Sequence, residues 1–201
     1  MRKLLLAAAA AILAAALWWR KNPSACPYGQ RFWVEAPHPF ITRDRLREIL
    51  EAEAGERILE VGPGTGYYTL DMAEWVGDGG TIEIFDIQQE MLDHTMRRAT
   101  ERGFTNVVPT LGNAESLPYE DHSVDAAVLT TVLGEIPDQD AAILELKRVL
   151  KPGGRLVVGE LFGDPHMVTL GSLQERAAAA DFEFERTVGP NPLGYFARFG
   201  A

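Results

Sequence analysis

Cysteine is almost missing from this chain. Cys26 is the one cysteine among 201 residues, which excludes an internal disulfide and any zinc site built from several cysteines. We therefore predict no metal site. With 46% hydrophobic residues the chain is long enough to bury one good core, and no repeat divides it.

Basic residues are scarce outside the first 21 positions. The chain has 19 Lys and Arg against 29 Asp and Glu, and Arg2, Lys3, Arg20 and Lys21 lie in that first stretch, which contains no acid. Beyond it, 15 basic residues face 29 acidic ones, a formal charge of −14. Nucleic-acid binding needs clustered Lys and Arg that contact phosphates, so we expect no nucleic-acid partner.

Two phosphate-binding motifs are absent as well. No G-x-x-x-x-G-K-[ST] loop occurs, which argues against a nucleoside triphosphate. A dinucleotide turn reads G-x-G-x-x-G, but here Tyr67 stands where its third glycine would be. The sequence therefore disfavours an NAD-dependent oxidoreductase, which is kept only as a lesser alternative.

One long apolar run is present, at the N-terminus. Leu4–Trp19 contains 16 residues without a charge, flanked by two basic residues on each side. As a helix it would be about 24 Å long, short of a ~30 Å hydrocarbon core, and the flanking basic residues and paired tryptophans compensate for the difference. We predict that residues 1–21 anchor the chain in a membrane, with the catalytic domain in the cytoplasm. A cleaved signal peptide and a helix packed on the domain are the alternatives, and the balanced flanks leave the orientation open.

Residues 22–39 are rich in proline and aromatic side chains and predict a linker that drapes over the domain or lies at the membrane surface. Residues 40–201 then predict one α/β domain. Its first helix begins after an N-cap at Thr42 and ends at Gly55. The remaining expected helices are 69–76, 88–102, 140–150 and 170–180.

Apolar strands alternate with these helices. Strands are expected at 58–61, 81–86, 106–111, 123–130 and 155–160, and 182–188 with 195–199 predicts a closing antiparallel hairpin. Strands separated by helices indicate a mostly parallel sheet with right-handed crossovers.

Three alternate glycines follow the first of these strands, at positions 62, 64 and 66. Glycine has no Cβ, so the backbone of this turn can approach a ligand, and the free N–H groups of the next helix point into the same space. Asp86 ends the second strand, where a carboxylate can accept both hydroxyls of a ribose. The pattern predicts a nucleoside ligand that lacks a polyphosphate.

These residues resemble the class I S-adenosylmethionine-dependent methyltransferases, most like the ubiquinone/menaquinone-biosynthesis type and related small-molecule enzymes. The stretch from Glu60 to Gly66 matches the family's E/D-x-G-x-G-x-G motif at every fixed position. Further matches in the expected order are Asp86, 112–115, 123–125 and 148–154. The resemblance covers roughly residues 40 to 200. It implies a Rossmann-like, doubly wound sheet of seven strands, one of them antiparallel, with S-adenosylmethionine lying across the strand ends.

The resemblance also assigns the cofactor contacts. Backbone at the glycines would approach the methionine part, the acid after the second strand would bind the ribose, and the turn at 112–115 would bind the adenine. The residues assigned in this way are Glu60, Gly62, Gly64, Gly66, Tyr67, Asp86, Ile87, Asn113, Ala114 and Thr130.

The methyl acceptor is less determined. Residues 132–138 resemble a loop that related enzymes often write V-L-H-E-I-P-D, but Gly134 takes the histidine position and puts a base there in doubt. The catalytic candidates are Glu135, Glu160, His166 and Tyr195. An acceptor that needs no base, such as a thiol or amine, stays equally open.

The predicted anchor favours a lipophilic small-molecule acceptor: a quinone precursor, a phospholipid amine, a thiol or a phenol. A non-catalytic cofactor-binding or scaffold protein with the same fold is the main alternative. The oligomeric state stays open.

Overall fold

The computed structural model describes residues 22–201, so the predicted anchor at 1–21 lies outside the described residues. No helix within 22–201 is long and apolar enough to cross a membrane.

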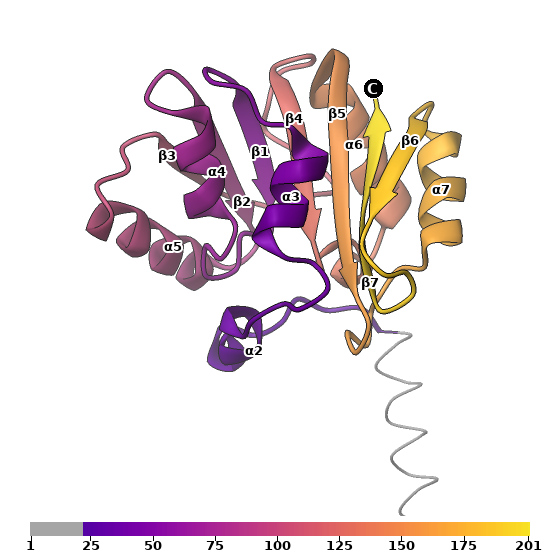
Figure 1. Ribbon diagram of the computed structural model, residues 1–201, viewed down its shortest axis with the longest axis horizontal. Helices are drawn as coiled ribbons and strands as arrows, with labels where there is room; N and C mark the ends of the chain where they lie inside the picture. The colour runs from indigo at the N-terminus through magenta and orange to yellow at the C-terminus, as the bar shows by residue number, and fades with distance from the viewer. Residues whose placement is uncertain (1–21) are drawn as a thin grey trace, which may run out of the picture.

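Seven strands form one sheet in the order β3-β2-β1-β4-β5-β7-β6 (Figure 1). Their bounds are β1 (Arg57–Val61), β2 (Thr81–Asp86), β3 (Val107–Leu111), β4 (Val124–Thr130), β5 (Leu150–Leu161), β6 (Glu183–Val188) and β7 (Gly194–Gly200). Only β7 runs antiparallel to its neighbours, and β1 to β5 pair in parallel. The predicted seven-stranded sheet with one antiparallel strand is confirmed.

Helices cover both faces of the sheet (Figure 1). On one face lie α3 (Arg43–Leu50), α4 (Thr69–Val76) and α5 (Gln89–Glu101), and on the other α6 (Gln139–Val149) and α7 (Leu170–Ala179). Successive strand residues point to opposite faces, so Ile58 joins the core under α3 to α5 while Leu59 joins the core under α6 and α7. This two-sided burial is the reason that the strands read as continuous apolar runs.

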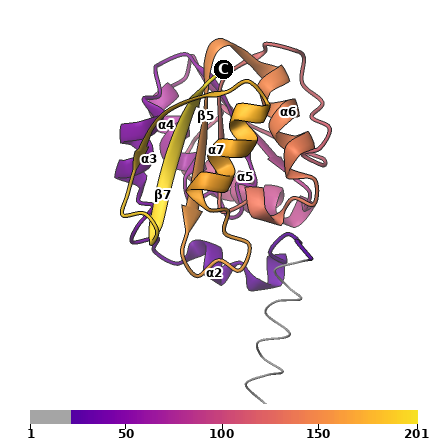
Figure 2. The same cartoon turned by 90° about the vertical axis from the view of Figure 1, so that its right-hand side faces the viewer.

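Three short helical elements lie outside the helices that cover the sheet: two precede α3, and one lies between β4 and α6. They are the 3₁₀ turn η1 (Tyr28–Gln30), the single-turn helix α2 (Phe32–Glu35) and the 3₁₀ turn η2 (Leu133–Glu135). Figure 2 shows α2 beyond the end of the sheet at which β5 finishes and β7 begins. We call this end, where the parallel strands finish, the carboxyl edge.

Most of the expected boundaries agree with the structure, and two were wrong. Thr42 caps α3 as expected, since its Oγ1 accepts from Arg45 N at 3.3 Å. The helix ends at Leu50 rather than at Gly55, because Glu51 takes a left-handed conformation with φ of 50°. β5 starts at Leu150 rather than at Arg155, because Leu150 already pairs with β4 before a register shift.

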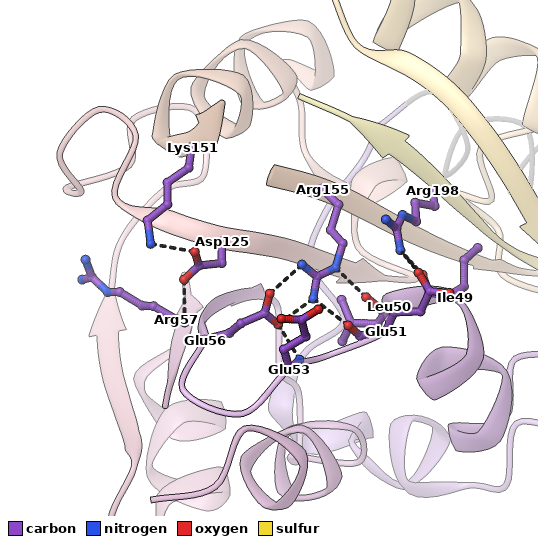
Figure 3. A network of polar contacts seen from close by, with 10 residues as sticks. All are labelled: Ile49, Leu50, Glu51, Glu53, Glu56, Arg57, Asp125, Lys151, Arg155 and Arg198. Atoms are coloured by element: carbon purple, nitrogen blue, oxygen red, sulfur yellow. Dashed lines mark hydrogen bonds and ion pairs between the residues drawn. The ribbon is translucent and has the colours of Figure 1, made fainter. Parts of the chain in front are cut away.

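Two arginines from neighbouring strands hold the end of α3 (Figure 3). Arg155 on β5 donates from Nε to Leu50 O at 2.5 Å, and Arg198 on β7 donates from Nη1 to Ile49 O at 3.2 Å. Arg155 also makes a bidentate pair with Glu56, with distances of 2.8 and 2.6 Å. Cations at a helix C-terminus also complement its dipole, so α3 is fixed on the sheet at the edge opposite the carboxyl edge.

We expect Arg155→Lys to lower the free energy of unfolding by about 2–4 kcal/mol, because lysine cannot keep the two-pronged contact and Glu56 loses hydrogen bonds in a site where Arg155 is only 8% exposed. Arg176→Lys is the control, since its pair with Asp140 is exposed and is expected to matter by less than about 0.5 kcal/mol. Urea titration of both variants measures the difference. Equal losses would contradict the role assigned to Arg155.

Candidate cofactor and acceptor site

The glycine turn after β1 adopts a conformation that side chains rarely tolerate. Gly62, Gly64 and Gly66 have φ values of 70°, 55° and 78°. A Cβ on Gly62 would lie 2.4 Å from Val132 Cγ2, and a Cβ on Gly64 would lie 2.6 Å from Val34 Cγ1. Glycine is therefore needed twice over, for backbone conformation and for space.

Asp86 lies beside this turn at the end of β2. Val61 pairs with Phe85 across the parallel ladder, and Gly62 N donates to Phe85 O at 2.8 Å, so the turn and the carboxylate are neighbours. Asp86 is 8% exposed, and its Oδ1 accepts from Gln88 N at 2.8 Å. Burial raises its pKa to about 6, although the backbone N–H of Gln88 acts in the opposite direction. Further donors, such as ribose hydroxyls, would stabilise the ionised form.

Two more polar groups lie on the same face of the sheet as Asp86. Glu60 is 3% exposed and accepts from Thr69 Oγ1 at 2.5 Å. Burial raises its pKa to about 7. Thr130 ends β4, and its buried Oγ1 has no hydrogen-bond partner among residues 22–201. A buried hydroxyl without a partner is costly, which indicates a place for a polar ligand group.

The turn after β3 lies next to Asp86, because Gly112 N donates to Asp86 O at 2.9 Å. Ala114 is buried, whereas Asn113 is exposed and its side chain bonds Glu115 twice, at 3.1 Å each. Ile87, placed against the adenine by the resemblance, is 59% exposed. The structure thus brings the predicted ribose and adenine residues together at one end of the sheet.

Tyr67 lies differently from the other predicted contacts. Its ring is 4.7 Å from the ring of His38, and the Arg43 guanidinium lies 4.2 Å above it. These partners come from the N-terminal side of the domain. The assignment of Tyr67 to the methionine part stays a prediction.

Residues 22–36, here called the strap, cross the carboxyl edge. Gln88 holds the strap twice, since its Nε2 donates to Cys26 O at 2.9 Å and its Oε1 accepts from Tyr28 N at 3.1 Å. Glu135 Oε2 accepts from Cys26 N at 3.2 Å. The chain after β2 and the chain after β4 are thereby joined over the glycine turn, where Val34 lies against Gly64.

Of the linker predicted at 22–39, Cys26 and Tyr28 contact the domain through Gln88 and Glu135, and its position at a membrane surface stays a prediction. Its attachment through Gln88 was not predicted, and the one available signal was the position of Gln88, two residues after the ribose-binding acid.

Carboxyl groups gather where η2 lies beside the end of β5 and the loop that follows it. Burial raises the pKa of Glu135 to about 8, opposed by the Cys26 N–H and reinforced by Asp164. Glu160 is 1% exposed, and burial raises its pKa well above the usual range. Its Oε2 accepts from Val168 N at 3.1 Å, whereas Oε1 has no partner among the described residues. Asp164 was not predicted, although its position three residues after β5 could have indicated it.

Two cavities open near these groups. One of about 220 Å³ is lined by Pro23, Gly134, His166 and neighbouring residues. The other, of about 410 Å³, lies between the β5–α7 loop and the β6–β7 turn, and its walls include Phe162, Asp164 and Pro192. Tyr195, a predicted catalytic residue, is fully buried and donates to Val168 O at 2.7 Å, so its hydroxyl is engaged in the scaffold.

Gly134 has a structural reason to be glycine. A Cβ there would lie 1.8 Å from His166 O and 2.7 Å from His166 C. No side chain fits between η2 and the β5–α7 loop. His166 itself is 7% exposed and lies beside the position that a histidine at residue 134 would have needed.

The raised pKa of Glu135 predicts a pH-dependent stability. In the unfolded chain this carboxyl has its ordinary pKa of 4.5, and in the fold its pKa is about 8, so between these pH values the folded state binds more protons than the unfolded chain. The contribution of Glu135 to the free energy of unfolding is therefore fully present below pH 4.5 and is lost as the pH rises towards 8.

We expect Glu135→Gln to remove about 2 kcal/mol of the decline in unfolding free energy between pH 5 and 8. Urea titrations at several pH values measure it, with the exposed Glu90→Gln as control. An unchanged pH slope in the Glu135 variant would contradict the assignment.

Comparison with known proteins agrees with this geometry. Residues 38–173 match the ubiE/COQ5 methyltransferase family. The chain belongs to this family. A "Ubiquinone/menaquinone biosynthesis C-methyltransferase UbiE" of Shewanella frigidimarina is 35% identical over 130 residues, which are 64% of this chain and 51% of that protein. The protein of the same name from Teredinibacter turnerae is 36% identical over 131 residues, or 65% and 51%. The chain therefore spans about half the length of the curated relatives it matches.

Solved structures extend the comparison of this family member. A SAM-dependent methyltransferase from Aquifex aeolicus superposes with a TM-score of 0.80 at 18% identity, covering 88% of this chain and 99% of that one, which supports the fold alone. The [4+2]-cyclase SpnF has a TM-score of 0.65 at 33% identity and covers 73% of this chain and 58% of that one. Family membership favours methyltransferase chemistry over the NAD-dependent alternative.

Proposed function

We propose that this family member transfers a methyl group from S-adenosylmethionine to a lipophilic small molecule. The observation that carries the proposal is the buried carboxylate of Asp86 beside three left-handed glycines. The residues present fit the cofactor, because Asp86 can accept from two ribose hydroxyls and Thr130 Oγ1 lacks a partner among the described residues. Bound S-adenosylmethionine supplies a methyl group on a cationic sulfur, already activated for transfer.

Each predicted cofactor residue has a defined task in this proposal. The backbone at Gly62, Gly64 and Gly66 would approach the methionine part, with Glu60 and Thr130 on the same side. Ile87 would contact the adenine face, and Asn113 with the backbone of Ala114 would bind its edge. Tyr67 is assigned to the methionine side by the resemblance alone.

The acceptor side is built around Glu135. The relatives' names describe those proteins as C-methyltransferases of ubiquinone/menaquinone biosynthesis, and a quinone precursor is one acceptor that we propose here. A carbon or phenol acceptor releases a proton when it is methylated, and Glu135 is the base that we propose for it. Because its pKa is raised to about 8, Glu135 takes the proton in its ionised form, which is the minor form at pH 7 and the major form above pH 8. His166 and Tyr195 are the other candidates. A phospholipid amine or a thiol would need less help from a base, so these acceptors belong to the same proposal.

We further propose that residues 4–19 hold the domain at a membrane, with the domain on the cytoplasmic side. The support is the uncharged run flanked by basic residues. Charged substitutions within it, Leu6→Glu with Leu13→Glu, are expected to move the full chain from the membrane pellet to the supernatant. Unchanged sedimentation would overturn this part.

The test of the reaction incubates the full chain with methyl-labelled S-adenosylmethionine and separate pools of quinone precursors, phospholipids, thiols and phenols. A labelled lipophilic product is expected. Cofactor binding by calorimetry without any labelled product would favour the non-catalytic alternative. If an acceptor is converted to a product that carries no label, a reaction without methyl transfer would be favoured. The name of SpnF describes such a reaction, a [4+2] cyclisation, for that protein. Absence of binding at millimolar cofactor would overturn the proposal.

A further inference from the structure

Large apolar side chains are exposed along the carboxyl edge. Phe162 directly follows β5 and Leu193 directly precedes β7, with exposed fractions of 66% and 42%. Phe162 N donates to Leu193 O at 3.0 Å, so these two are neighbours. Phe32 and Trp33 of α2 are 56% and 65% exposed at the same end of the molecule (Figures 1 and 2). We call these four residues the apolar rim.

The aromatic pair of α2 is turned away from the domain. Val34 of the same turn lies against Gly64, whereas the rings of Phe32 and Trp33 pack on each other at 4.7 Å. A one-turn helix thus presents one side to the glycine turn and an aromatic side to the outside. Exposed tryptophan and phenylalanine at one end of a protein are typical of contact with a membrane interface.

The described part of the chain begins at this same edge. Pro23, its second residue, lines the cavity beside Gly134. In the sequence, Pro23 follows the apolar run 4–19 by four residues.

The charge of the domain determines which kind of membrane surface the apolar rim can bind. Residues 22–201 contain 29 acidic and 15 basic residues, so an anionic surface would repel the domain. At the edge itself, the carboxyl groups of Asp86 and Glu160 are buried, those of Glu135 and Asp164 are half-buried, and the exposed Glu35 of α2 pairs with Arg31 at 3.9 Å, so this edge presents little net charge. A neutral, zwitterionic headgroup layer is the surface that offers apolar contact without this repulsion.

We propose that the carboxyl edge rests on a zwitterionic bilayer, with Phe32, Trp33 and Phe162 in the headgroup layer. The entrance to the 410 Å³ cavity, which Phe162 lines, then faces the lipid. This inference rests on the proposed lipophilic acceptor and gives it a route: the acceptor passes from the bilayer to the site without crossing water.

The test reports which face of the full chain meets lipid. In a Cys26→Ser background, one cysteine is introduced by Phe162→Cys or, as the matched control, by Leu144→Cys on α6, where the side chain is 56% exposed. Each is labelled with a fluorophore and mixed with phosphatidylcholine vesicles that carry a headgroup quencher. We expect strong quenching at 162 and little at 144, and a drop at 162 to the control level when Phe32→Ser and Trp33→Ser are added.

Several results would overturn the inference. Equal quenching at both positions would mean that the chain binds vesicles without docking this edge, and no quenching at either would mean no docking at all. If the label at 162 is shielded from solvent before lipid is added, this edge is covered by protein. Shielding that is independent of protein concentration would point to the chain's own apolar run, and shielding that increases with concentration would point to a second copy of the chain. None of these measurements depends on methyl transfer, so the docking proposal can be wrong while the proposed reaction is right, and the reverse.

Discussion

Asp86→Ala is expected to weaken S-adenosylmethionine binding by at least about a hundredfold, because it removes the acceptor of two charge-assisted hydrogen bonds. The buried position of the carboxylate beside the glycine turn makes replacement by water ineffective. Calorimetric titration of the cofactor into the full chain measures the loss. Asp93→Ala on the exposed side of α5 is the matched control, with unchanged affinity expected.

The variant Asp86→Asn separates charge from geometry. Asparagine keeps an acceptor for Gln88 N, so the local turn stays in place. With a pKa of about 6, the wild-type carboxyl protonates below that pH, and the affinity should then fall by up to about tenfold per pH unit. The Asn variant should bind weakly at all pH values without that dependence. Affinity within threefold of wild type for the Ala variant would contradict the ribose assignment.

Gly134→Ala is expected to cost about 3 kcal/mol or more of unfolding free energy, although it adds a single methyl group. The added Cβ would overlap a carbonyl oxygen of the β5–α7 loop, and backbone cannot turn aside as a flexible side chain does. Urea titration measures the loss. Gly171→Ala in α7 is the control: a Cβ there meets nothing within 4 Å, and helix propensity favours alanine by up to about 1 kcal/mol.

The close approach of Gly134 to the His166 backbone also explains why position 134 does not hold the histidine of related enzymes. Gly134→His would restore the V-L-H-E-I-P-D pattern of the related loop, yet it needs the space that His166 backbone occupies. We expect this variant to be at least as unstable as Gly134→Ala and to gain no activity. A stable Gly134→Ala protein, within about 1 kcal/mol of wild type, would show that the loop can move. The origin of any base would then have to be reconsidered.

The sequence was a good guide wherever local rules decide the structure. β2 follows from its apolar run, and α5 from the spacing of Met91, Leu92, Thr95 and Ala99, all of which are buried. The end of α3 was predicted at a glycine, but arginines that are 105 and 149 residues distant from their carbonyl partners hold it at Leu50. A contact over that separation leaves no local signature.

Some residues of the candidate site could likewise be predicted from the sequence, and others could not. The glycines and Asp86 could be placed because each follows a strand directly, and parallel strands end at one edge. The contact of His166 with Gly134 could not, since it joins two loops through backbone atoms. Asp164 and Gln88 were missed because a single carboxylate or amide in a loop resembles any other until the fold brings it to the edge.

The way in which the strap is held has a consequence for which of its residues can vary. All three bonds that tie Cys26 and Tyr28 to Gln88 and Glu135 use backbone atoms of the strap. At Cys26 the course of the strap therefore does not depend on the side chain, whereas Tyr28 adds a side-chain bond between its hydroxyl and His94 Nδ1 at 3.2 Å. Substitution of Cys26 can change this face of the strap while Gln88 and Glu135 keep its backbone in place, so variation at this position is separable from folding.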